Sequence, residues 1–159
     1  MKRMQIGGCA KGMRKYYLYL IKEDIATDYL GKERMFYKLF SEHTKTDDSL
    51  LKLETAKQID YITLPISVWR LQKLLFGDLQ KNKSFKQQDS HTYYIENGNL
   101  SSAQLRLTKQ YIVIEAEGYY DAESIFFEIL RKNEPSFLAI DVENARFGWL
   151  KPIKERNLI

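Results

Sequence analysis

The side chains that most often bind metals or act as nucleophiles are scarce in this chain and lie far apart in it. The 159 residues include two histidines, His43 and His91, and neither belongs to a His-x-x-x-His or His-x-Glu pattern. The single cysteine, Cys9, follows two glycines in a segment without periodicity, so no structured base is expected beside it. We therefore expect neither a metal centre nor a nucleophilic cysteine.

Paired glycines and paired acids, which in other proteins bind phosphate or perform acid–base chemistry, have simpler explanations here. Gly7-Gly8 lacks the preceding strand and the following helix of a phosphate-binding loop. Asp47-Asp48 precedes a helical pattern and is interpreted as a cap, while Glu115 and Glu117 alternate along a strand and are interpreted as its exposed face. The sequence therefore predicts a protein that is not an enzyme and that needs no cofactor.

The composition indicates one ordinary folded domain. Hydrophobic residues make up 44% of the chain and charged residues 29%, which is enough to bury a core and to keep the protein in solution. The net charge of +4 arises from 25 basic and 21 acidic residues, a balance unlike that of a dedicated nucleic-acid binder. One cysteine excludes an internal disulfide, and no apolar run approaches the ~18 residues of a membrane span. We expect a cytoplasmic protein that is monomeric when free and makes no membrane contact.

The first residues have no periodicity and contain three glycines. Residues 6–9 (IGGC) resemble a lipoprotein cleavage site, but a signal peptide needs an apolar core of about 7–15 residues before that site. Only three residues separate Arg3 from Gly7, so lipidation is not expected. We expect residues 1–12 to be a disordered leader and residues 13–159 to form a single domain.

Residues 103–142 carry the clearest structural pattern, which predicts strand, turn, strand, helix and strand in that order. Leu105 and Leu107 alternate with polar neighbours, and residues 111–116 are β-branched and aromatic. From Asp121 the period changes to that of an amphipathic helix, with an apolar face made of Ala122, Ile125, Phe126, Ile129 and Leu130. Residues 137–140 then form a short buried strand. This segment predicts a hairpin with a helix packed on it.

Shorter patterns predict the other elements. Residues 16–21 predict a strand, and residues 92–96 predict another that ends at the hairpin turn Asn97-Gly98. Helices are predicted over residues 22–30, 32–43, 49–62 and 66–75, a polar loop over residues 77–91, and caps for the third helix at Thr46 and Asp47. The predicted fold class is α+β, with a mostly antiparallel sheet, several amphipathic helices packed on it, and the helices of residues 23–76 grouped together. Trp149 is expected to anchor the C-terminal segment.

One candidate surface is basic. It comprises Lys81, Lys83, Lys86, Lys151, Lys154 and Arg156. Lysines alone make salt-dependent, non-specific contacts with nucleic acid, and no base-reading motif accompanies them, so solvated charge is the favoured interpretation. The alternative is a small basic nucleic-acid-binding regulatory module.

A second candidate surface is apolar and helical. The predicted helices of residues 23–30 and 49–62 carry more apolar residues than one core-facing stripe needs. One face of the intervening helix carries Met35, Phe36, Leu39 and Phe40. A broad apolar surface on the later helix comprises Leu51, Leu53, Ala56, Ile59 and Ile62. The additional positions are Ile25 and Tyr29 on the first helix and Gln58, Tyr61 and Ile62 on the later one. Spacing alone favours the core for all of them, but exposed members would form a helical protein interface.

Four segments resemble the family of sporulation inhibitors of replication called SirA. They are residues 15–23 (KYYLYLIKE), 57–66 (KQIDYITLPI), 120–132 (YDAESIFFEILRK) and 146–157 (RFGWLKPIKERN). The resemblance runs from about residue 15 to the terminus and does not cover residues 1–12 or 77–91 convincingly.

The resemblance implies a function that composition could not indicate. Proteins of the SirA type bind the N-terminal domain of the replication initiator DnaA and block new rounds of initiation in sporulating bacilli. Carried over, the largely apolar interface falls on Ile25, Tyr29, Gln58, Tyr61 and Ile62, with Tyr29 and Ile62 as anchors. Where relatives can carry an aromatic, this chain has Ile25, which keeps an apolar contact of smaller area. The resemblance implies a one-to-one complex with DnaA at the origin or replisome and no direct contact with nucleic acid.

Overall fold

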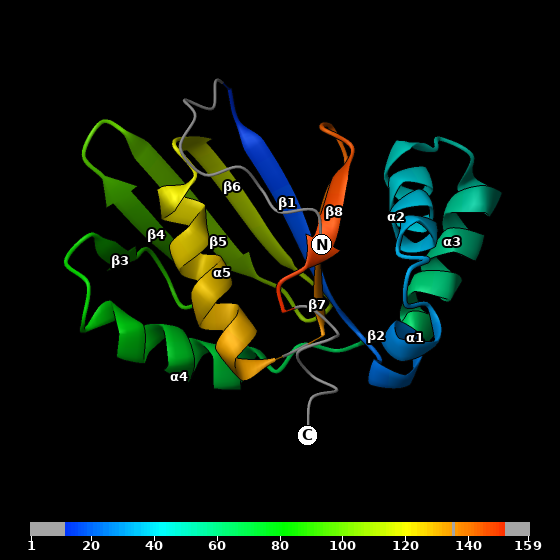
Figure 1. The fold of residues 1–159 in the computed structure, drawn as a ribbon, viewed down its shortest axis with the longest axis horizontal. Helices are drawn as coiled ribbons and strands as arrows, with labels where there is room; N and C mark the ends of the chain where they lie inside the picture. Colours follow the sequence, from blue (N-terminus) through cyan, green and yellow to red (C-terminus); the bar gives the residue numbers. More distant parts are fainter. Residues whose placement is uncertain (1–11, 135, 152–159) are drawn as a thin grey trace.

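The computed structural model describes residues 12–134 and 136–151, and within them five helices surround one eight-stranded antiparallel sheet (Figure 1). The predicted α+β class is therefore confirmed. The predicted leader, apart from Gly12, and the residues beyond 151 lie outside the described residues. The elements in chain order are β1 (Arg14–Ile21), α1 (Glu23–Asp28), α2 (Arg34–Lys45), α3 (Ser49–Ile62), β2 (Thr63–Leu64), α4 (Val68–Leu79), β3 (Phe85–Gln87), β4 (Thr92–Asn97), β5 (Ser101–Leu107), β6 (Ile112–Gly118), α5 (Asp121–Asn133), β7 (Phe137–Asp141) and β8 (Arg146–Trp149).

The strand β1 lies at the centre of the sheet, whose strand order is β3-β4-β5-β6-β1-β7-β8 with β2 paired to β1. Its two edges pair with β6 and β7, so that Leu18 lies between Ile112 and Ala139. Side chains alternate along a strand, and β1 is apolar on both sides. Leu18 faces one buried core, while Tyr19 faces the other.

The helices α4 and α5 cover one face of the sheet (Figure 1). The helix α5 packs on β4, β5 and β6 through the apolar face that its sequence period predicted, with Phe126 fully buried. The rings of Phe126 and Phe85 meet edge to face at 5.6 Å, which ties α5 to the edge strand β3. The predicted hairpin with a helix packed on it is confirmed.

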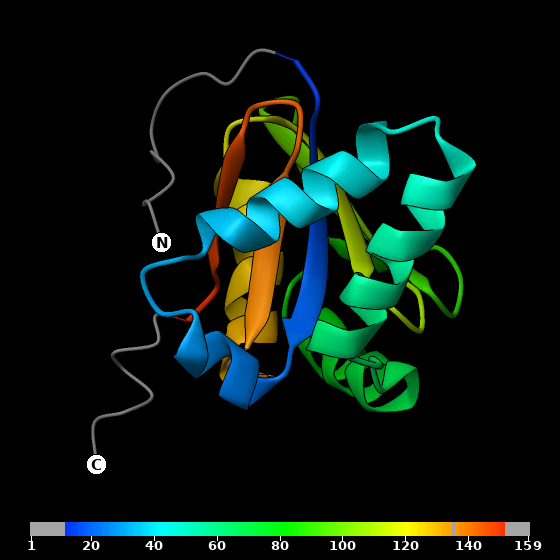
Figure 2. The same ribbon diagram turned by 90° about the vertical axis from the view of Figure 1, so that its right-hand side faces the viewer.

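The helices α1, α2 and α3 cover the other face, over β1, β7 and β8 (Figure 2). The ring of Phe40 on α2 stacks on Tyr19 of β1 with centroids 4.2 Å apart. Phe36, one turn earlier, meets the indole of Trp149 edge to face at 6.0 Å. Trp149 is only 3% exposed and holds β8 against α2, while residues 152–159 of the C-terminal segment lie outside the described residues.

The prediction that the helices of residues 23–76 form one group is wrong. The helix α4 lies across the sheet from α1–α3, and it contributes Leu71 and Leu75 to the core beneath α5. The crossing follows from backbone pairing after α3. The short strand β2 pairs with the end of β1, and the amide of Ile66 then donates a 2.7 Å hydrogen bond to the carbonyl of Lys109 in the β5–β6 turn. The helix α4 therefore begins on the face of the sheet opposite to α1–α3.

Several element boundaries and orientations also differ from the prediction. Asp48, and neither Thr46 nor Asp47, caps α3, because its carboxylate accepts hydrogen bonds from the amides of Leu50 and Leu51. The predicted loop of residues 77–91 contains the end of α4 and the strand β3. Met35 and Leu53, which the sequence placed on the apolar faces of their helices, are exposed.

Replacing Gly118 with alanine should destabilise the fold by more than about 2 kcal/mol. Gly118 has φ +78°, and a Cβ there would lie 2.0 Å from the carbonyl oxygen of Leu100, which is backbone and cannot rotate away. Gly77→Ala is the matched control, because nothing lies within 4 Å of its Cβ position and it sits inside α4. The control should raise the stability by up to about 1 kcal/mol. Urea unfolding of both variants measures the difference, and equal stabilities would refute the steric argument.

Candidate protein-binding site

The start of α1 and the end of α3 meet at Lys22. The amide of Lys22 donates a 2.9 Å hydrogen bond to the carbonyl of Ile62, and its ammonium group lies 4.9 Å from the centre of the Tyr61 ring. Two helices that are separated by the whole of α2 in sequence therefore contribute to one surface. Four residues of the predicted interface lie on these two helices, and Tyr29 is the residue directly after α1, which ends at Asp28.

These five residues are neither all core nor all surface. Tyr61 is 69% exposed and Gln58 is exposed, whereas Ile25, Tyr29 and Ile62 are half-buried and pack against the core beneath α1–α3. The Tyr29 ring lies 5.3 Å from that of Phe36. The surface therefore combines free groups with groups held in place by the core, which is the arrangement of a preorganised interface.

The structure adds two leucines to this surface that the sequence did not assign to it. Leu50 is 65% exposed, and Leu53 is exposed beside it on the solvent side of α3. Together with Tyr61 they occupy positions i, i+3 and i+11, which lie on one face of a helix. One sequence feature could have indicated that some leucines of α3 are exposed. The apolar residues are distributed too evenly around this helix to form a single core-facing stripe.

A polar contact explains why these leucines point outward. Thr55 and Ile59 are the buried residues of α3, and the Thr55 hydroxyl lies 2.8 Å from Nδ1 of His43 on α2. Burial lowers the pKa of His43, and the charge of Lys52 lowers it further, so the imidazole is neutral at pH 7. The helix α3 thus packs on α2 through its threonine face, and the leucine face remains in solvent.

The titratable residues considered for metal binding serve local structure. His43 bonds to Thr55, and Nδ1 of His91 lies 2.8 Å from the Ser90 hydroxyl. Across residues 12–134 and 136–151, no group of three or more His, Cys, Asp or Glu side chains is placed to hold a metal ion. Among the same residues, none of the helices has the length and apolar character needed to span a membrane.

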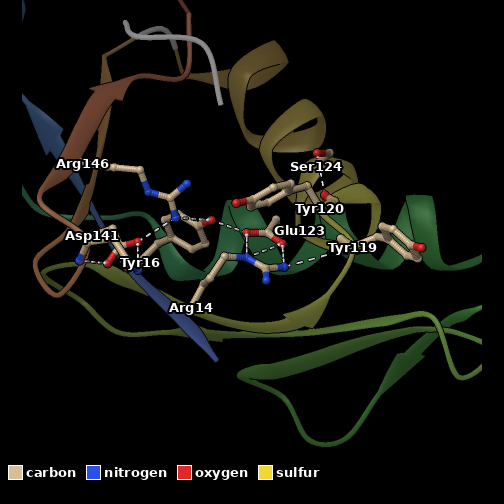
Figure 3. Close-up of polar contacts among 9 residues, drawn as sticks. Arg14, Tyr16, Tyr119, Tyr120, Glu123, Ser124, Asp141 and Arg146 are labelled. Atoms are coloured by element: carbon tan, nitrogen blue, oxygen red, sulfur yellow. Dashed lines mark hydrogen bonds and ion pairs between the residues drawn. The ribbon is translucent and has the colours of Figure 1, made fainter. Parts of the chain in front are cut away.

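A buried ionic network lies at the opposite end of β1 from α1 (Figure 3). Arg14 and Glu123 are both buried, and the guanidinium Nε lies 3.0 and 3.2 Å from the two carboxylate oxygens of Glu123. Arg14 also donates to the carbonyl oxygen of Tyr119 at 3.3 Å, and the Tyr16 hydroxyl donates to the Glu123 carboxylate. Sequence reasoning missed this pair, because its members are 109 residues apart.

The network continues from β1 to the C-terminal strands (Figure 3). Arg146 on β8 donates to Asp141 on β7 at 2.8 Å and approaches the Tyr16 hydroxyl at 3.5 Å. The ring of Tyr120 lies 4.5 Å from the Arg14 guanidinium and 5.8 Å from that of Arg146. Burial, and next the Glu123 charge, raises the pKa of Tyr16, so its hydroxyl remains a donor. Arg14 is thus paired with Glu123, and Arg146 with Asp141. These contacts join β1, α5, β7 and β8 and serve the fold.

The basic surface is only partly described. Lys81, Lys83 and Lys86 are exposed around β3, and Lys151 is half-buried, while Lys154 and Arg156 lie outside the described residues. The lysines at β3 are therefore a separate group, on the α4 side of the molecule.

These features define a small α+β protein in which α1 and α3 present partly exposed apolar groups. The family model of the sporulation inhibitor of replication protein SirA matches residues 14–154. A relative from Bacillus subtilis (strain 168), also a sporulation inhibitor of replication protein SirA, is 40% identical over 148 residues, which cover 92% of this chain and 99% of the relative. The chain therefore belongs to the SirA family. Members of this family are regulatory inhibitors of replication, so the resemblance and the non-enzymatic class predicted from the sequence are confirmed.

Replacing Glu123 with glutamine should cost about 3 kcal/mol of folding stability, because it leaves the Arg14 cation buried without a counter-charge. Glu128→Gln on the same helix is the control, since its ion pair with Arg131 lies at the surface and should change stability by less than about 0.5 kcal/mol. Thermal and urea unfolding of both variants measure the two costs. A Glu123→Gln variant as stable as the control would mean that the pair contributes nothing to folding.

Proposed function

We propose that this protein inhibits replication initiation during sporulation by binding the N-terminal domain of DnaA through the helical surface of α1 and α3. Membership of the SirA family supports the inhibitory role. The proposed contact residues are Ile25, Tyr29, Gln58, Tyr61 and Ile62. The observation that carries the proposal is the position of Tyr61, which is largely exposed next to the core-packed Ile62.

The chemistry of this surface suits a protein partner. Tyrosine is enriched among residues that dominate binding energy, because it combines apolar area with a hydroxyl and few rotatable bonds. Leu50 and Leu53 add exposed apolar area nearer the start of α3, with the exposed Glu54 and Lys57 between them and Tyr61. Gln58 adds an amide that can hydrogen-bond at the edge of the contact. An apolar centre with polar edges is the general form of a specific protein interface.

Rigidity favours tight binding at this site. Tyr29 is held against Phe36, and Ile62 is held by the hydrogen bond between its carbonyl and the amide of Lys22. Groups that are already ordered lose little conformational entropy when a partner docks. The surface therefore needs no rearrangement to present its apolar groups.

The proposed mechanism is occlusion. The initiator's N-terminal domain is the docking site for its self-assembly and loading partners, and a rigid protein of this size seated there competes with them. The complex is one-to-one and forms in the cytoplasm, where DnaA acts at the origin. Loss of initiation follows from the loss of those contacts, without any chemical step.

Tyr61→Ala should weaken binding to the DnaA N-terminal domain by about 2 kcal/mol, roughly thirtyfold in Kd, with little change in unfolding temperature. Tyr61 is the sharpest choice because it is exposed, whereas truncating Tyr29 also removes a contact with Phe36. Calorimetric titration of the protein with the purified domain of a bacillus DnaA measures stoichiometry and affinity.

Leu100→Ala is the control, because Leu100 is an exposed apolar residue in the β4–β5 turn, away from α1 and α3. It should bind as the unmodified protein does. Unchanged affinity of Tyr61→Ala would move the site elsewhere while leaving the function intact. Absence of binding by the folded, unmodified protein would overturn the function itself.

A further inference from the structure

The solvent face of α4 carries two large aromatic residues that are more than half exposed. Trp69 is 67% exposed and Phe76 is 54% exposed, and their i, i+7 spacing places them on one side of the helix. The aliphatic residues Leu71 and Leu75 face the core instead. This helix therefore buries its aliphatic side chains and exposes its aromatic ones, the opposite of what burial by hydrophobicity alone predicts.

A cation lies between the two rings. Lys73 is one turn after Trp69 and one turn before Phe76, and its ammonium group lies 3.8 Å from the centre of the Trp69 ring. The face thus alternates ring, cation and ring along α4. This pattern interrupts an apolar stripe, so it is poorly suited to an apolar partner helix.

The surrounding charge is strongly basic. Residues 64–91 contain five cationic side chains, at Arg70, Lys73, Lys81, Lys83 and Lys86, against two acidic ones, at Asp78 and Asp89. Their net charge of +3 is most of the +4 of the whole chain. Arg70 is paired with Glu134 at 2.9 Å, while the three lysines around β3 are exposed.

We propose that this face of α4 and β3 binds single-stranded nucleic acid. Trp69 and Phe76 stack on unpaired bases, and Lys73, Lys81 and Lys83 contact the phosphates. Aromatic rings beside a basic track are the usual means by which proteins bind single strands without sequence preference. Duplex DNA is disfavoured as a ligand because its bases are already stacked on one another. An acidic protein segment matches the charge but leaves the two exposed aromatic side chains without a stacking partner.

This inference is independent of the proposed DnaA contact. The helix α4 lies across the sheet from α1–α3, so one partner on each side can be bound at once (Figure 1). The expectation of no nucleic-acid contact came from the family resemblance and from the absence of a base-reading motif near the lysines. The structure adds stacking groups, because α4 exposes Trp69 and Phe76 in the segment that precedes these lysines.

The two tryptophans make the test direct, since Trp149 is buried and Trp69 is exposed. Titration with an oligothymidylate of about 16 nucleotides at low salt should quench the tryptophan emission, and affinity should fall as salt rises. Phe76→Ala keeps the reporter and should weaken binding by at least about fivefold. Lys73→Gln should reduce the slope of log K against log salt by about 0.7, whereas Lys38→Gln on α2 should not change it.

Other outcomes overturn the proposal. Absence of quenching, together with unchanged anisotropy of a labelled oligonucleotide, would show that no single strand is bound. Equal affinity for duplex and single strands, or an unaffected Phe76→Ala variant, would reduce the contact to charge and reject stacking. Tighter binding of a polyglutamate peptide than of the oligonucleotide would assign the face to an acidic protein segment. The oligonucleotide titration contains no DnaA domain, so a negative result does not affect the proposed DnaA contact. A negative DnaA titration likewise does not affect the proposed binding of single strands.

Discussion

Burial of β1 on both faces is the constraint on which the rest of the structure depends. This strand is hydrogen-bonded along both edges, by β6 and β7, and its side chains alternate between two cores. A strand with apolar groups on both sides needs a helical layer on each side to exclude water. One layer is formed by α1–α3 and the other by α4 and α5. The two candidate binding surfaces are the outer faces of these two layers.

The two outer faces have different chemistry because the helices meet the core differently. In the first layer α3 packs on α2 through Thr55, which leaves leucines and Tyr61 in solvent next to core-packed groups. In the second layer α4 buries its leucines and exposes Trp69 among cations. Exposed apolar side chains do not stabilise a monomer, so those on α3 and α4 are available for contacts with other molecules. One face suits a protein and the other suits a charged, planar ligand.

The ionic network at the start of β1 acts on the fold and not on a substrate. It links β1 to α5 through Arg14 and Glu123, and to the last two strands through Tyr16 and Arg146. Desolvation makes a buried ion pair a weak net contributor to stability, but separation of its members is costly. The network therefore opposes any arrangement in which α5 or β8 is displaced from β1. It fixes how elements that are far apart in the sequence are assembled around the central strand.

The sequence by itself determined the type and order of most elements, the α+β class and the family. Hydrophobic period and turn residues are local properties, so the strand at Tyr16, the helix from Asp121 and the hairpin at Gly98 were all predictable. It also marked Tyr61 as a candidate, but could not tell whether it was core or surface. Only the tertiary structure placed α4 across the sheet, paired Arg14 with Glu123 and exposed Trp69. The reason is that a helix's period shows which residues share a face, whereas long-range contacts select the face that meets the core.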